Sequence, residues 1–253
     1  MVGSRREAAG ENAALTNERV VMHHWYSTSR IIIGAALLGL LTDCAGERPA
    51  ARPAPPATEA AAPADHPTDR PTIVFLGTSL TAGYGLPTPD SAYPAVVQML
   101  LDSAGLRYTV VNAGVSGESS AGALRRVDWV LRSKPAFLVI ETGANDGLRG
   151  QDPDSVRANI QAMIDRARTQ SPDTRIVLAG MEALPNLGQD YVRRFRAIFP
   201  ALAKRNSLPL IPFLLQGVAG IDSLNQDDGI HPDNRGARIA AHTVWHTLEP
   251  LLR

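Results

Sequence analysis

From residue 72 to the C-terminus, short apolar segments alternate with longer amphipathic segments, and this alternation is the strongest constraint on the fold. The apolar segments, rich in Val, Ile and Leu, predict strands at 72–77, 108–114, 136–143, 175–180 and 208–213. The amphipathic segments predict helices at 93–105, 120–134, 152–170, 188–206 and 234–252. Strands that are apolar throughout, separated by helices, predict a parallel sheet that is covered on both faces. Ligands of such sheets bind at the carboxyl ends of the strands.

The N-terminal region has a different composition. Residues 31–41, "IIIGAALLGLL", form an uncharged apolar run that follows Arg30. A helix that spans a membrane needs about 20 such residues, so the run is too short and resembles the core of a secretory signal. We therefore predict an export signal over 1–45, with Met22 as an alternative start of translation because "MHHWYSTSR" is a short basic lead. The alternative is a buried apolar helix.

Cys44 is the only cysteine and lies just beyond this run, in "LLTDC". Bacterial lipoprotein signals place a leucine three positions before the lipid-modified cysteine, and Leu41 matches that pattern. Asp43 departs from it, because a small residue is usual there. Lipidation of Cys44 is therefore one prediction, and ordinary cleavage of the signal is the other. Without further cysteines, the chain needs no disulfide in an oxidising compartment.

Residues 46–71, "GERPAARPAPPATEAAAPADHPTDRP", lack large apolar side chains and are rich in proline and alanine. We expect a semi-rigid tether here and a single domain over 72–253. The 25 basic and 25 acidic residues balance, so no broad basic field predicts a nucleic-acid partner.

The glycine-rich turn after the first strand, "GTSLTAGYG" (77–85), could bind phosphate or expose a nucleophile. It lacks the Lys-Ser/Thr pair of a nucleotide-binding P-loop and the G-x-G-x-x-G fingerprint of dinucleotide sites. The G-x-S-x-G elbow begins at Gly77 and Ser79, but Thr81 stands where the last glycine is required. Ser79 is therefore a candidate nucleophile, with a turn or cap residue as the plainer alternative.

Other polar blocks supply what a nucleophilic serine needs, and they are "NAGVSGES" (112–119), "GAND" (143–146) and "DDGIHP" (227–232). His231 could accept the serine proton, and Asp228 could orient the histidine from three residues away. An oxyanion requires fixed donors. Gly114 is predicted to offer a backbone N–H, and Asn145 a side-chain amide.

Together these blocks resemble those of the SGNH (GDSL) hydrolases, in particular the small periplasmic thioesterases, lysophospholipases and arylesterases of bacteria. The resemblance implies a flavodoxin-like three-layer α/β/α sandwich whose five parallel strands have the order 2-1-3-4-5. It also implies a catalytic set of Ser79, Asp228 and His231, with Ser79, Gly114 and Asn145 forming the oxyanion hole. Glu118-Ser119 replaces a common Asp-Thr. Thr78 replaces the usual Asp, and we expect its hydroxyl to accept backbone N–H groups and to leave the enzyme active.

The sequence thus predicts an exported, periplasmic serine esterase or thioesterase that acts through an acyl-enzyme without metal or cofactor. Its expected substrates are small-molecule or lipid esters, with 181–188 ("MEALPNLG") as a candidate wall for an acyl chain. The protein is expected to be a monomer, attached to a membrane if Cys44 is lipidated. The alternatives are a carbohydrate O-acetylesterase of the cell envelope and a binding module that has lost catalysis. His242 and His246 have helical spacing, but a metallohydrolase would need a third ligand that is not evident.

Overall fold

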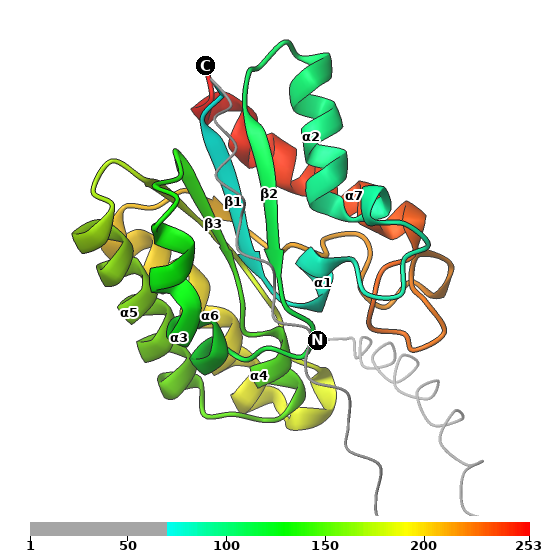
Figure 1. Ribbon diagram of the computed structural model, residues 1–253. Helices are drawn as coiled ribbons and strands as arrows, with labels where there is room; N and C mark the ends of the chain where they lie inside the picture. The colour runs from blue at the N-terminus through cyan, green and yellow to red at the C-terminus, as the bar shows by residue number, and fades with distance from the viewer. Residues whose placement is uncertain (1–69) are drawn as a thin grey trace, which may run out of the picture. The chain divides into compact units, whose positions relative to one another are not determined.

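The computed structural model describes residues 70–253. The predicted export signal, Cys44 and nearly all of the predicted tether lie outside these residues. The strands are β1 (Thr72–Gly77), β2 (Thr109–Gly114), β3 (Phe137–Glu141), β4 (Arg175–Ala179) and β5 (Leu210–Ile211). They form one parallel sheet in the order β2-β1-β3-β4-β5 (Figure 1), which confirms the predicted fold class and strand order.

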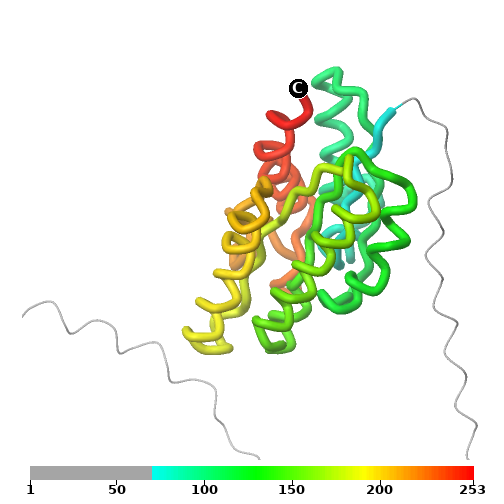
Figure 2. Tube along the Cα trace, turned by 90° about the vertical axis from the view of Figure 1, so that its left-hand side faces the viewer, coloured from blue at the N-terminus to red at the C-terminus, as the bar shows by residue number. Residues whose placement is uncertain are grey.

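Helices cover both faces of the sheet and complete three layers. One face carries α2 (Tyr93–Ser103) and α7 (Asn234–Leu248). The other carries α3 (Ser120–Leu131), α5 (Pro153–Gln170) and α6 (Gln189–Asn206). Figure 2 shows α5 and α6 running alongside each other in yellow-green and yellow.

The edge strand β5 is shorter than predicted. It contains only Leu210 and Ile211, whereas the sequence suggested a strand over 208–213. Pro209 and Pro212 flank the pair, and proline has no N–H to donate to a neighbouring strand. The edge strand β5 can therefore pair with β4 over two residues only.

Short helices that the sequence pattern did not reveal follow two central strands at their carboxyl ends. They are α1 (Ser79–Ala82) after β1 and α4 (Ala144–Leu148) after β3, and both lie near the lower end of the sheet in Figure 1. The remaining turns of helix are of the 3₁₀ type: η1 (Pro89–Ser91), η2 (Pro185–Leu187), η3 (Asp222–Leu224) and η4 (Glu249–Leu251).

The core lies between the sheet and its helices. The side chains of β1 from Ile73 to Leu76 are at most 2% exposed, and those of β3 from Leu138 to Ile140 are fully buried. Burying a large apolar side chain contributes roughly 1.5–3 kcal/mol, so these central strands form a rigid base for the loops at their ends. Within residues 70–253, no helix is long and apolar enough to cross a membrane.

Candidate active site

Ser79 lies where the central strand β1 gives way to α1. It is the first residue of that helix and is 8% exposed. Its Oγ lies 2.9 Å from Nε2 of His231, which comes from the loop before α7. The structure therefore brings together two residues that are 152 positions apart in the chain.

Asp228 holds both the ring and the backbone of His231. Its Oδ2 lies 2.6 Å from Nδ1 of the ring, and its Oδ1 accepts the N–H groups of Ile230 and His231 at 2.9 and 3.0 Å. Asp233, two residues after His231, caps the start of α7. The helix thus anchors the loop, and one carboxylate sets the tautomer and direction of the imidazole.

The pKa of Asp228 is lowered to about 2. Partial desolvation acts in the opposite direction, but it is outweighed by the backbone N–H and the ring of His231, by the Ile230 N–H and by the nearby imidazole charge. Asp228 is therefore ionised at neutral pH.

The sequence did not suggest the residues that support this loop from outside. The Gln226 N–H donates to the His231 carbonyl at 2.7 Å, and its side-chain amide donates to the carbonyls of Tyr84 and Pro232. The Tyr84 ring lies 4.8 Å from the imidazole, tilted by 44°. Gln226 thereby connects the turn after α1 to the histidine loop.

A buried carboxylate, Glu141 at the end of β3, lies beneath the serine turn. It is fully buried and accepts the Thr78 N–H at 2.8 Å, the Thr78 hydroxyl at 3.0 Å and the Thr81 hydroxyl at 2.8 Å. Thr81 in turn bonds to the hydroxyl of Tyr93 at 2.7 Å. Burial raises the pKa of Glu141, and the hydrogen bonds from Thr78 and Thr81 only partly oppose that rise.

The prediction that the Thr78 hydroxyl accepts hydrogen bonds is therefore wrong. Its hydroxyl does not cap α1 by accepting backbone N–H groups; it donates to the carboxylate of Glu141. The reason is that Glu141, 63 residues away in sequence, offers a buried acceptor on that side of the turn.

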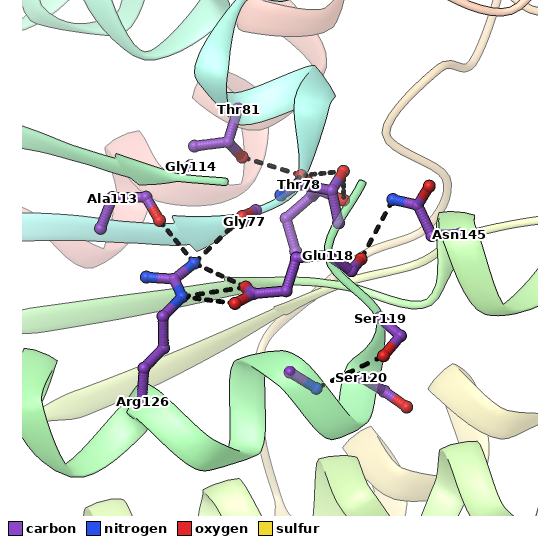
Figure 3. A network of polar contacts seen from close by, with 12 residues as sticks. Gly77, Thr78, Thr81, Ala113, Gly114, Glu118, Ser119, Ser120, Arg126 and Asn145 are labelled. Carbon is purple, nitrogen blue, oxygen red and sulfur yellow. Dashed lines mark hydrogen bonds and ion pairs between the residues drawn. The ribbon is translucent and has the colours of Figure 1, made fainter. Parts of the chain in front are cut away.

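Asn145 is fixed on α4 with its amide beside the loop that follows β2. Its Nδ2 donates to the Glu118 carbonyl at 3.0 Å (Figure 3). The next residue, Asp146, is 3% exposed and accepts both the N–H and the hydroxyl of Ser120 at 2.7 Å. The start of α3 thereby holds α4, and one hydrogen of the Asn145 amide remains available to a ligand.

The structure does not support Gly114 as a free donor. Its N–H donates to the Asn112 side chain at 3.0 Å, as in an Asx turn, and a Cβ there would overlap the backbone of α1 at Ala82. Gly114 thus permits close packing of β2 against α1. Gly117, three residues on, has a φ of 78° and an N–H without a hydrogen-bond partner among residues 70–253.

The segment 181–188 lies next to α4. Ala183 is within 3.5 Å of the position that a Cβ on Gly147 would take, and Met181 and Ala183 are buried. Leu184 is 42% exposed, so it is the large apolar side chain of this segment that a substrate could contact most readily. The cavity beside Ser79 and Leu86 holds only about 10 Å³, roughly the space of one water molecule.

His242 and His246 lie on α7, away from these contacts. Within residues 70–253, no group of three or more His, Cys, Asp or Glu side chains could hold a metal ion.

A serine beside a histidine that a carboxylate orients, at the carboxyl edge of a doubly covered parallel sheet, is the arrangement used by the class of α/β serine hydrolases. Comparison with known proteins defines the family. Residues 75–239 match the GDSL-like Lipase/Acylhydrolase family, and the chain belongs to it.

Similar proteins are known by sequence and by structure. Esterase TesA of Pseudomonas aeruginosa is 39% identical over 182 residues, which cover 72% of this chain and 89% of that protein. Thioesterase 1/protease 1/lysophospholipase L1 of Escherichia coli is 33% identical over 182 residues, or 72% of this chain and 85% of the relative. A crystal structure of TesA superimposes with a TM-score of 0.68 at 38% identity, covering 71% of this chain and 99% of TesA.

Proposed function

We propose that this protein hydrolyses carboxylic esters and thioesters through an acyl-enzyme on Ser79. The observation that carries the proposal is the pair of short contacts from Ser79 Oγ to His231 (2.9 Å) and from His231 to Asp228 (2.6 Å). These contacts suit removal of the serine proton as its oxygen attacks a carbonyl. The chemistry needs no metal or cofactor.

In the first half-reaction, Nε2 of His231 takes the Ser79 proton while Oγ bonds to the carbonyl carbon. The imidazolium then gives that proton to the departing alcohol or thiol, and the acyl-enzyme remains. In the second half, His231 takes a proton from water, the hydroxide attacks the acyl carbon, and the proton returns to Ser79. Asp228, ionised throughout, stabilises each imidazolium.

The negative charge on the carbonyl oxygen requires donors that are already in place. We assign this role to the N–H of Ser79, the side-chain amide of Asn145 and the N–H of Gly117 in place of Gly114. Within residues 70–253, neither backbone N–H is engaged elsewhere, and Asn145 has a hydrogen left after its bond to Glu118.

The names of the relatives guide the choice of substrates. One is an esterase and another a thioesterase and lysophospholipase, so we propose small-molecule and lipid esters and thioesters. Exposed Leu184 and Leu148 on the α4 side, and Tyr84 and Ile230 on the histidine side, offer apolar surface for an acyl chain. A carbohydrate O-acetylesterase would instead show activity on short acyl esters only, without rising toward longer chains.

The decisive experiment is turnover of 4-nitrophenyl esters of increasing chain length by Ser79→Ala. We expect a loss of several orders of magnitude for every ester, by analogy with other serine hydrolases. His242→Ala is the matched control, since it removes a histidine of α7 outside the site, and it should leave turnover unchanged. Retention by Ser79→Ala of more than roughly a tenth of wild-type turnover would exclude Ser79 as the nucleophile.

We further propose that residues 1–45 export the protein to the periplasm and that residues 46–71 tether the domain, with a lipid on Cys44 as the anchor. The described residues begin just before the amino end of β1, and Ser79 follows the carboxyl end of that strand. Metabolic labelling with a fatty-acid analogue in a bacterial host tests the anchor. Label on wild type but not on Cys44→Ala supports it, whereas an unlabelled, soluble periplasmic product indicates simple cleavage.

A further inference from the structure

Arg126 on α3 connects the chain segments that converge on the candidate oxyanion site. Its Nε donates to both oxygens of Glu118 at 2.8 and 2.9 Å, and its Nη2 lies 2.7 Å from Oε2 of the same carboxylate. The same Nη2 donates to the Ala113 carbonyl at 2.8 Å and to the Gly77 carbonyl at 3.2 Å. Figure 3 shows the guanidinium between these groups, at the ends of β1 and β2.

The pair is largely shielded from water. The side chains of Arg126 and Glu118 are 19% and 10% exposed, the most buried Lys or Arg ion pair within residues 70–253. A shielded pair is not reliable evidence of stabilisation, because desolvation offsets the attraction between the charges. The bonds of Arg126 to backbone carbonyls point instead to a role in geometry.

Two of the backbone segments that the pair joins lie next to proposed oxyanion donors. The Gly77 carbonyl belongs to the peptide unit just before Thr78 and Ser79. Glu118 directly follows Gly117, and the Glu118 carbonyl accepts the bond that fixes the Asn145 amide. The side chain of Glu118 is thus tied to Arg126 while its backbone is tied to Asn145.

We propose that Glu118 and Arg126 act as a positioning pair that fixes the oxyanion donors. Arg126 suits this role because its planar fork can bind a carboxylate through two nitrogens and still reach a carbonyl, whereas lysine offers only a point charge. Neither residue reaches the reacting atoms, so the pair acts through the Gly117 backbone and Asn145. This inference rests on the proposed function.

The first test is the steady-state kinetics of Arg126→Lys and Glu118→Gln on a short nitrophenyl ester. Misplacing catalytic donors by about 1 Å costs about 10²-fold, so we expect kcat to fall by roughly 10- to 100-fold while KM changes little. Glu118→Asp, which keeps the charge on a shorter side chain, should recover most of the lost kcat. If any variant is poorly folded, titration with a fluorophosphonate gives the concentration of competent sites, to which kcat is then referred.

Arg166→Lys is the matched control. Arg166 also donates to a carbonyl of α3, that of Leu124, and pairs with an aspartate, Asp128. These contacts lie between α5 and α3, away from the ends of β1 and β2, so this variant should keep wild-type kcat.

A double-mutant cycle with Asn145→Ala separates positioning from general stability. Asn145→Ala alone should cost about 10²- to 10³-fold in kcat, the usual effect of losing one oxyanion donor. If Arg126 acts partly through Asn145, Arg126→Lys should cost far less in that background than in wild type. Fully additive effects, or wild-type kcat in both Arg126→Lys and Glu118→Gln, would overturn the inference. Full activity of Ser79→Ala and Asn145→Ala would instead overturn the proposed function.

Discussion

Two carboxylates flank the serine turn, and they are in opposite electrostatic situations. Asp228 lies on a loop with 39% of its side chain exposed, and its pKa is lowered to about 2. Glu141 is fully buried at the end of β3, and burial raises its pKa. Both accept backbone N–H groups and side-chain donors, so the number of hydrogen bonds does not explain the difference. Access to water does, because desolvation of Glu141 outweighs the bonds that it accepts.

The difference separates two kinds of task. A carboxylate that must stabilise an imidazolium needs to be charged, and Asp228 stays charged across the neutral range. A carboxyl group that holds a turn needs only its acceptors, and Glu141 holds Thr78 and Thr81 on either side of Ser79. We therefore expect Asp228 variants to affect mainly turnover and Glu141 variants mainly folding.

The largest expected effect is that of Asp228→Asn. The amide cannot stabilise the imidazolium or hold the same tautomer, and the equivalent change in another serine hydrolase costs about 10⁴-fold in kcat. We expect a loss of up to this size in a protein that is still folded at neutral pH, although less stable there than wild type because the ionised Asp228 contributes to stability. A loss of less than about tenfold would remove the distinction between the two carboxylates.

The pH dependence of turnover follows next in size. Because the pKa of Asp228 is about 2, its charge does not change between about pH 8 and about pH 5. A base must be neutral to accept the serine proton, so turnover should fall toward acid pH, and a fall that persists in Glu141→Gln belongs to neither carboxylate and is assigned to His231. A flat profile of kcat/KM, measured with enzyme shown to be folded at each pH, would exclude His231 as the base.

Glu141 variants should lower the stability of the fold more than they lower turnover. Glu141→Ala leaves the Thr78 N–H and two hydroxyls without their acceptor in a buried site, and we expect a cost of about 3 kcal/mol in the free energy of unfolding. Glu141→Gln keeps the volume and one acceptor and should cost less. Urea unfolding measures both, and a Glu141→Ala protein as stable as wild type would contradict this account of the turn.

The two carboxylates should also affect stability with opposite signs along the pH scale. The raised pKa of Glu141 means that its contribution is fully present below the ordinary glutamate value and is lost as the pH rises through the folded-state pKa. The hydroxyl of Tyr93 is hydrogen-bonded to that of Thr81, which also contacts Glu141, so Tyr93 is part of the same buried polar cluster. The lowered pKa of Asp228 gives a contribution that is present above the ordinary aspartate value and is lost as the pH falls toward about 2. Urea midpoints across pH should therefore flatten on the alkaline side in Glu141→Gln and on the acid side in Asp228→Asn.

The smallest expected effect is that of Thr78→Val. It removes one donor to Glu141 at nearly constant volume, so we expect a cost of about 1 kcal/mol and turnover within about tenfold of wild type. Thr78→Ser keeps the hydroxyl and is the control. Thr78→Asp brings a second acidic group to the buried Glu141, so its cost should grow as the pH rises. If the wild-type protein is inactive and Thr78→Asp restores ester turnover, the natural protein is instead a binding module that has lost catalysis.

The parts of the fold and site that local sequence determines could be predicted. The alternation of apolar and amphipathic segments is enough to predict a sheet between two layers of helices. The contact between Asp228 and His231 could be predicted because they are only three residues apart. The strand order came from the family resemblance. In contrast, α1 and α4 are too short to show a periodic pattern, and prolines shortened β5.

Contacts between distant residues could be predicted only where the motifs and the family resemblance pointed to them, as for Ser79 and His231. Nothing around Thr78 indicates that Glu141 will lie beneath it, since 63 residues separate them. Gly114 illustrates the same limit at short range. Asn112 closes a turn on the Gly114 N–H, and the sequence "NAGVSG" alone does not show which glycine N–H stays unpaired.

The central claim, that Ser79 is the nucleophile of a hydrolase, can be tested directly by mass spectrometry after reaction with an alkyl fluorophosphonate. The account predicts one adduct per molecule, formed with loss of fluoride and located on Ser79. Labelling should be much slower in Asp228→Asn and unchanged in His242→Ala. An adduct on another residue, or no adduct on an enzyme that still turns over esters, would contradict the account.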